Sequence, residues 1–259
     1  MTDEQCRTSQ IAPTGAASTP CVWDPVRLLL GTYLFADLTP AALGPLAARL
    51  TSRCYRRDEY VARAGEPAVA LYIVVHGRLK ELLTTQDGAE LVTELYGTGD
   101  VFGEPALFSR DRTRLVSIAA IDPSEVAALD REVLIGFLHR HPPAMMRMLQ
   151  GLAEYVRAEA HDMANIAFRP IRDRLALQLL ELADTAHTPE KTIAISQTTL
   201  AAMIAATREN VNRNLADLAA GGYIHIHGRT LTITDPIALR RLADRALQLQ
   251  PPPNRPSAP

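Results

Sequence analysis

Arg208, Glu209, Asn212 and Arg213 lie within six consecutive positions of the 259-residue chain, directly after Thr207. Arginine can donate two hydrogen bonds to the O6 and N7 edge of guanine, and glutamate can accept one from the N4 of cytosine. In a helix, the first three residues would cluster within one turn, and Arg213 would follow Glu209 one turn later. We interpret the set, with Thr207, as side chains that read DNA bases; the alternative is a solvated face of ion pairs.

The sequence around these side chains has the pattern of two short helices and a hairpin. Ser196 is a typical N-cap for a helix over residues 197–205, and a second helix is predicted over residues 207–218. Two helices joined by a short turn form a helix-turn-helix, whose second helix enters the major groove by its N-terminal residues. A β-hairpin, the wing, is then predicted over residues 223–227 and 230–234.

A second set of residues suits the binding of a phosphate and a sugar. It comprises Gly103, Glu104, Arg112 and Thr113, within the glycine-containing segment over residues 97–117. Backbone N–H groups at a helical turn and a guanidinium would face a phosphate, and the carboxylate would accept hydrogen bonds from sugar hydroxyls. The segment therefore predicts a cradle for a phosphorylated ligand.

Short β-like runs separated by turn residues surround this cradle. The runs are residues 60–63, 71–75, 79–83, 91–96, 115–121 and 125–129. Their regular spacing predicts a barrel or sandwich. Arg110, Arg112 and Arg114 occupy alternate positions before the fifth run, so we expect them to share one face of a strand, which could simply be solvated.

Residues 142–168 are predicted to form a long helix shared by two subunits. A stripe with alternating steps of three and four would face the partner helix: Leu149, Leu152, Val156, Glu159, Met163 and Ile166. Met145 and Met148 extend this stripe toward the N-terminus. The alternative is a core helix that packs only on its own domain.

Composition excludes several classes of function. Hydrophobic residues make up 47% of the chain and the formal net charge is −2, with a small positive excess in residues 169–250. Electrostatics alone would not make a nucleic-acid binder, so DNA binding depends on where individual arginines lie. We find no Ser/His/Asp constellation, Walker loop or metal triad, and thus expect neither an enzyme nor a metal protein. The absence of a long apolar run predicts no membrane segment and a cytoplasmic protein.

The segment over residues 97–117 resembles the phosphate-binding cassette of the cyclic-nucleotide-binding domain in the cyclic-AMP receptor protein and fumarate–nitrate regulator (CRP/FNR) superfamily. The run over residues 196–235 is similar to the winged-helix domain of the same regulators. The resemblance implies that Glu104 holds the ribose 2′-hydroxyl and that Arg112, Thr113 and nearby backbone hold the cyclic phosphate. It also implies that the recognition helix reads a TGTGA-like half-site.

The cassette departs from the family pattern in ways that leave the effector open. Gly103 and Arg112 are closer than in many cyclic-nucleotide binders, and Pro105 removes a backbone N–H. Glu159 stands where cyclic-AMP-responsive members have a hydroxyl residue, and a carboxylate suits the two adjacent donors of guanine. It could equally be a polar residue that sets the register of a dimer seam. Cyclic AMP, cyclic GMP and cyclic di-GMP are the candidate effectors; the alternative is a vestigial pocket in a regulator that needs no ligand or senses haem or redox.

The expected fold is α+β, in five parts. These are a disordered tail (1–23), a cyclic-nucleotide-binding-like β-roll (24–138), a dimerisation helix (139–168), a winged helix-turn-helix domain (169–249) and a second tail (250–259). The expected partners are a second copy of the chain and double-stranded DNA with an inverted-repeat operator, with RNA polymerase as a further candidate. Ligand binding would change how the long helices pack and so position the two recognition helices.

Overall fold

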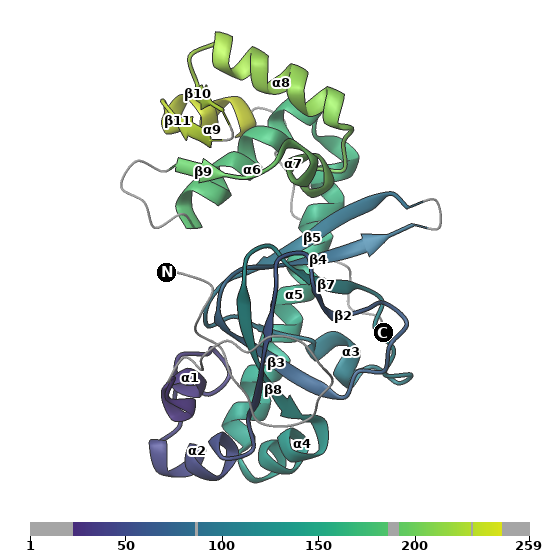
Figure 1. Cartoon of the computed structure of the whole chain (residues 1–259), viewed down its shortest axis with the longest axis vertical. Coiled ribbons are helices and arrows are strands. Elements are labelled where there is room, and N and C mark those ends of the chain that lie inside the picture. Colours follow the sequence, from purple (N-terminus) through teal and green to yellow (C-terminus); the bar gives the residue numbers. More distant parts are fainter. Residues whose placement is uncertain (1–22, 86–87, 186–191, 229, 245–259) are drawn as a thin grey trace, which may run out of the picture. The chain divides into compact units, whose positions relative to one another are not determined.

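The computed structural model describes residues 23–85, 88–185, 192–228 and 230–244 (Figure 1). Its contacts divide the chain into two compact units, Met1–Arg157 and Ala158–Pro259. The predicted tails, except for Trp23, lie outside the described residues. The α+β fold predicted from sequence is confirmed, with a β-rich first unit, a long helix and a helical second unit that carries a small sheet.

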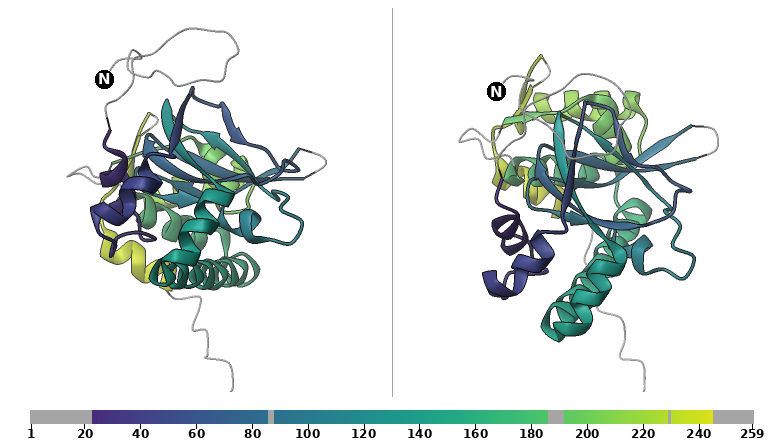
Figure 2. Two further views of the ribbon diagram at one scale, coloured as in Figure 1. Left: turned by 90° about the horizontal axis from the view of Figure 1, so that it is seen from below. Right: turned by 60° about the horizontal axis from the view of Figure 1, so that its bottom comes forward.

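The first unit begins with two short helices, α1 (Pro25–Leu30) and α2 (Pro40–Ala47). Asp24 caps α1 by accepting from the backbone N–H of Val26 at 2.9 Å, and Thr39 caps α2. These helices pack against each other, and the views in Figure 2 show them side by side. Buried apolar side chains from this region, including Phe35, join the core beneath the first sheet.

Two antiparallel four-stranded sheets form the β-roll. The first has the order β1 (Thr51–Tyr55), β8 (Ser124–Asp130), β3 (Ala70–His76), β6 (Val101–Phe102), and the second β2 (Tyr60–Ala62), β7 (Ser117–Ala120), β4 (Leu79–Thr84), β5 (Glu90–Tyr96). Strands β1 and β6 were not predicted, because β1 is mostly exposed and β6 has two residues. The core between the sheets includes Val74, Leu79, Phe102 and Ile118.

Gly77 joins β3 to β4 in a conformation that other residues rarely adopt. Its φ is 96°, and a Cβ there would lie 2.2 Å from Oγ of Ser124. Both backbone conformation and space therefore require glycine at this turn. The turn sets the register of β4, which in turn pairs with β5 and carries Glu81 into the interior.

Three helices complete the first unit: α3 (Glu104–Phe108), α4 (Arg131–Arg140) and the start of α5 (Pro142–Phe168). Helix α4 was not predicted, although Asp130 caps it by accepting from the N–H of Glu132 at 2.9 Å. Its Phe137 packs edge to face on Phe35, with ring centroids 5.7 Å apart. Helix α4 thus covers the same core as the helices at the start of the chain.

Helix α5 has the predicted long apolar stripe, but with one correction at its N-terminal end. Leu149, Val156 and Met163 are 55%, 65% and 72% exposed in the single chain. Met148 is 3% exposed and packs in the core of the first unit, so the prediction that it extends the exposed stripe was wrong. The first turns of α5 bury one face against their own domain, and that face includes Met148.

The second unit is a winged helix-turn-helix built on its own core. Its elements are α6 (Ile171–Thr185), β9 (Thr192–Ala194), α7 (Gln197–Met203), α8 (Arg208–Ala220), β10 (Ile224–His227), β11 (Thr230–Ile233) and α9 (Pro236–Asp244). The strands pair antiparallel in the order β10, β11, β9. Helix α9 was not predicted and packs on α6. The core residues of this unit include Leu179, Val211, Leu215 and Leu239.

Candidate functional site

Helix α8 presents the predicted base-reading residues on its exposed side. Thr207 caps the helix, its hydroxyl accepting from the backbone N–H of Asn210 at 3.3 Å. All five predicted residues are exposed: Thr207, Arg208, Glu209, Asn212 and Arg213. The opposite side carries Val211, Leu215 and Leu218, each at most 1% exposed. Burial of that side fixes the rotation of α8 and points the polar side chains away from the core.

The polar side chains of α8 do not pair off with one another as ions. Arg213 donates to the side-chain oxygen of Asn210 at 3.0 Å rather than to Glu209. Within the described parts of the chain, Arg208 and Glu209 form no ion pair. Their hydrogen-bonding groups are therefore available to base edges, which disfavours the alternative of a solvated face of ion pairs.

The turn between α7 and α8 carries a strained residue. Ala205 has a φ of 48°, in the left-handed region, and the following N–H of Ala206 donates to the carbonyl of Ala201 at 2.9 Å. A left-handed backbone costs alanine roughly 1–2 kcal/mol relative to its ordinary conformations. The turn keeps this conformation because the buried sides of both helices hold it.

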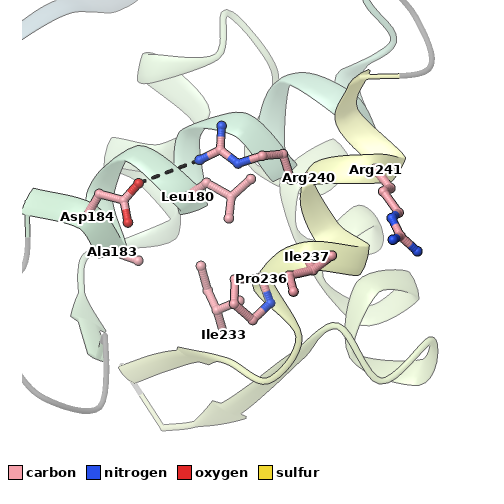
Figure 3. Close-up of a pocket in the computed structure, with 8 residues that line it drawn as sticks. All are labelled: Leu180, Ala183, Asp184, Ile233, Pro236, Ile237, Arg240 and Arg241. Atoms are coloured by element: carbon pink, nitrogen blue, oxygen red, sulfur yellow. Dashed lines mark ion pairs between the residues drawn. The ribbon is translucent and has the colours of Figure 1, made fainter.

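A hollow of about 300 Å³ lies elsewhere in the second unit, between α6, β11 and α9 (Figure 3). Leu180, Ile233 and Ile237 supply apolar surface, and Arg240 forms an ion pair with Asp184 at 3.6 Å. No residue of α8 lines it. The hollow is therefore separate from the predicted DNA-binding side of α8.

The predicted phosphate and sugar cradle lies at the start of α3. Gly103 is the N-cap with a φ of 100°, and Pro105 occupies the first turn, so one backbone N–H is missing there. Glu104 is buried, and burial raises the pKa of its carboxyl above the ordinary value. Its Oε1 accepts a hydrogen bond of 3.0 Å from the hydroxyl of Tyr33.

Arg114, rather than Arg112, lies beside Gly103. Arg114 is 4% exposed, its guanidinium lies 5.1 Å from the ring centroid of Tyr72, and Nη1 is 3.5 Å from the position of a Cβ on Gly103. Its Nη2 is buried without a hydrogen-bond partner among the residues that the structure describes. Arg112, by contrast, is exposed.

The expectation that Arg110, Arg112 and Arg114 share one strand face was wrong. Arg112 has a φ of 51°, which interrupts an extended strand, and β7 begins only at Ser117. Thr113 forms one isolated bridge to Pro67. The chain turns at Arg112, so that Arg114 enters the interior while Arg110 and Arg112 stay outside.

A hollow of about 460 Å³ adjoins Glu104 within the first unit. Its wall combines β-roll residues with the start of α5: Tyr33, Glu94, Tyr96, Val101, Glu104, Pro105, Arg147, Gln150, Gly151, Leu152, Glu154 and Tyr155. Tyr96 donates to the buried carboxylate of Glu81 at 2.8 Å, and burial followed by the charge of Glu81 raises the pKa of Tyr96. The hollow is rich in hydrogen-bond acceptors.

The sequence analysis did not single out Tyr33, Tyr96 or Arg114 as binding residues. Tyr33 is 71 positions from Glu104 in the chain, so no local spacing could join them. Glu159, which it did single out, is exposed on α5, one turn beyond Tyr155. The predicted roles of Gly103, Glu104, Arg112, Thr113 and Glu159 in ligand binding stay predictions.

Two further properties bear on the kind of protein. In the described ranges, no group of three or more His, Cys, Asp or Glu side chains is placed to hold a metal ion. Among the helices that the structure describes, none has the length and apolar character that crossing a membrane would require.

Comparison with known proteins matches both segments to known domain families. A model of the cyclic nucleotide-binding domain matches residues 52–141, and a model of the Crp-like helix-turn-helix domain matches residues 173–242. The "CRP-like cAMP-activated global transcriptional regulator" of Mycobacterium tuberculosis is 31% identical over 224 residues, which are 85% of this chain and 98% of that protein. The "cAMP-activated global transcriptional regulator CRP" of Pasteurella multocida is 28% identical, over 75% of this chain and 97% of that protein.

A solved structure shows the same arrangement of elements. The c-di-GMP responsive global regulator CLP of Xanthomonas campestris aligns with a TM-score of 0.68 and 25% identity, covering 76% of this chain and 100% of that chain. Fold and site together define a transcription regulator that joins a cyclic-nucleotide-binding domain to a DNA-binding helix-turn-helix. The chain belongs to the CRP/FNR superfamily. Its relatives are named as transcription regulators, and nothing in the comparisons indicates catalysis.

Proposed function

We propose that this regulator is a homodimer whose DNA binding is controlled by a cyclic nucleotide in the β-roll. The observation that carries the effector proposal is the guanidinium of Arg114, buried beside Gly103 with Nη2 unpartnered. A buried guanidinium nitrogen without a hydrogen-bond partner is costly, and a phosphate on the ligand would supply the missing acceptor. Glu104 would accept from a sugar hydroxyl of the same ligand.

The acceptor-rich hollow supports a guanine nucleotide over an adenine one. Guanine offers two adjacent donors on its edge, and the carboxylates of Glu94 and Glu154 line the hollow in addition to that of Glu104. The named relatives respond to different ligands, since the M. tuberculosis protein is called cAMP-activated and the X. campestris protein c-di-GMP responsive. Calorimetry with cyclic AMP, cyclic GMP and cyclic di-GMP tests the proposal; binding of none of the three would contradict it.

A second candidate function is a regulator whose pocket is vestigial and binds no cyclic nucleotide. Tyr33 already satisfies Glu104, and the three carboxylates of the hollow would repel a phosphate placed near them. In that case operator binding would be the same with and without every cyclic nucleotide. An absorption spectrum of the purified protein would reveal a haem, and a thiol titration would reveal a redox response.

The apolar stripe of α5 supports the homodimer. Leu149, Val156 and Met163 are exposed at heptad-like spacing, and exposed large apolar side chains in a row mark an interface. Val156→Glu is expected to convert the protein to a monomer in sedimentation experiments. Ala158→Glu places the same charge on another face of α5 and should leave the dimer intact; equal effects of the two variants would contradict this seam.

The two recognition helices of such a dimer would read an inverted repeat with half-sites about 34 Å apart. The test is a footprinting and affinity experiment with and without the cyclic nucleotide, using the parent protein and Val156→Glu. The dimer should protect two half-sites and the monomeric variant should bind much more weakly. RNA polymerase is the protein partner we propose for activation, to be tested by transcription with purified components.

A further inference from the structure

Tyr33 makes with Glu104 the contact that the proposed function assigns to a sugar hydroxyl. Its hydroxyl donates to Oε1 of Glu104 at 3.0 Å, inside the hollow that both residues line. Tyr33 is 42% exposed, and the partial burial of its phenol, followed by the nearby charge of Glu104, raises its pKa, so the hydroxyl remains protonated at neutral pH. A carboxylate oxygen already bonded in this way is satisfied before any ligand arrives.

Two residues of α5 hold Tyr33 in this position. Gly151 faces its ring, and a Cβ on Gly151 would lie 2.6 Å from the Tyr33 hydroxyl oxygen. Arg147 donates from Nη1 to the backbone carbonyl of Tyr33 at 3.2 Å and forms an ion pair with Asp37. Side chain and backbone of Tyr33 are thus both fixed against α5, and the glycine provides the space for the ring.

We propose that Tyr33 occupies the hydroxyl subsite of the ligand pocket and competes with the ligand for Glu104. The inference rests on the proposed function, because it needs a ligand that carries a sugar hydroxyl. A ligand with a free 2′-hydroxyl replaces the phenol as donor to Glu104. Tyr33 thereby determines specificity, since the exchange requires a donor on the ligand at that position.

The competition has a measurable signature. A hydrogen bond to a charged group contributes enough that losing it changes an equilibrium by roughly 10-fold or more. When a ribonucleotide binds the parent protein, its 2′-hydroxyl replaces the Tyr33 phenol as the donor to Glu104. The 2′-hydroxyl therefore adds little to the binding free energy. In Tyr33→Phe, the 2′-hydroxyl of the ligand donates instead to an oxygen of Glu104 that only water had contacted before. A 2′-deoxy ligand has no hydroxyl to donate to Glu104, so the Tyr33 phenol keeps its hydrogen bond to this carboxylate.

The experiment measures the affinities of the 2′-hydroxyl and 2′-deoxy forms of cyclic AMP and cyclic GMP for the parent and for Tyr33→Phe. Tyr33→Phe is expected to tighten binding of the 2′-hydroxyl form about 10-fold and to change the 2′-deoxy form by less than about twofold. Tyr60→Phe, which removes a phenol hydroxyl outside the hollow, should change neither. Gly151→Ala, which displaces the ring without removing the hydroxyl, should tighten the 2′-hydroxyl form in the same direction.

Each other outcome decides the question. Equal tightening of both ligand forms by Tyr33→Phe would mean that the ring only blocks space, and weaker binding would make Tyr33 a ligand contact; either result overturns the competition. If both forms bind the parent and Tyr33→Phe alike, only this inference fails. If neither protein binds any cyclic nucleotide, the proposed effector fails first and the inference with it.

Discussion

The two sites of this regulator differ in how the chain assembles them. The predicted DNA-binding residues lie within seven positions, at the N-cap and the start of α8, and all of them are exposed. The β-roll site brings Tyr33 and Glu104 together with the start of α5, and Arg114 lies beside Gly103. Helix periodicity alone positions the first set, whereas the second depends on strands of both sheets, α3 and α5 having folded. Local spacing can bring together residues of one element, but it cannot predict which distant segments meet.

The two sites also differ in their effect on the stability of the folded protein. Exposed arginines on α8 remain solvated, so they place little demand on stability. In the β-roll, Glu81, Glu104 and Arg114 are all less than 9% exposed, and a buried polar group that lacks a partner costs stability. Removing a residue should therefore affect mainly DNA affinity in the first case, and both stability and ligand binding in the second.

The largest effect is expected from Arg208→Ala combined with Arg213→Ala. Each base contact contributes about 1–3 kcal/mol, so the double variant should lose most specific operator binding while its thermal unfolding stays close to that of the parent. Fluorescence anisotropy at fixed salt measures the loss. Arg241→Ala, an exposed arginine on α9, is the matched control. Parent-like operator affinity in the double variant would contradict the assignment of α8.

A second prediction separates the two arginines of the cassette. Arg114→Gln should weaken cyclic-nucleotide binding by about 1.5–3 kcal/mol, because it removes a charged donor for the phosphate. Arg112→Gln changes an exposed side chain and should have a much smaller effect. Calorimetry on folded samples of both variants gives the comparison. A greater loss from Arg112→Gln would restore the interpretation reached from sequence.

A smaller effect, on the free energy of unfolding, is expected at Ala205 in the strained turn of the helix-turn-helix. Ala205→Gly removes the backbone strain of a left-handed alanine in the folded state, but it also raises the conformational entropy of the unfolded chain. The net stabilisation should therefore be about 0.5–1 kcal/mol. The free energy of unfolding of the second unit, measured in urea, reports it. A destabilised variant would show that the alanine methyl makes contacts that outweigh its backbone strain.

The smallest expected effect is a change in stability due to Glu104, and it is confined to one range of pH. Burial raises the pKa of Glu104, so between the ordinary carboxyl pKa and the raised one the folded state binds more protons than the unfolded state. The free energy of unfolding contributed by this group therefore falls as pH rises through that window. Glu104→Gln should be more stable than the parent at pH 8 and not at pH 4, by thermal unfolding. Glu90→Gln, at an exposed position, should show no such difference.

Local signals predicted much of the fold. The predicted cap at Ser196 begins α7, as Asp24, Thr39 and Thr207 begin α1, α2 and α8 in the structure, because a side-chain oxygen next to free N–H groups acts within one turn. What the sequence analysis missed depends on contacts between distant segments. Arg114 is buried with its guanidinium over the ring of Tyr72 on β3, and Met148 is buried because it packs in the core of the first unit. Periodicity cannot tell which face of a helix meets its own domain.

The boundary between the two units falls at Arg157–Ala158, inside α5, which runs unbroken for 27 residues. The chain therefore passes from one unit to the other in helical conformation, with continuous backbone hydrogen bonds rather than a loop. A pair of glycines inserted after Arg157 is expected to weaken the helix at this point, because glycine in a helix interior costs about 1 kcal/mol relative to alanine.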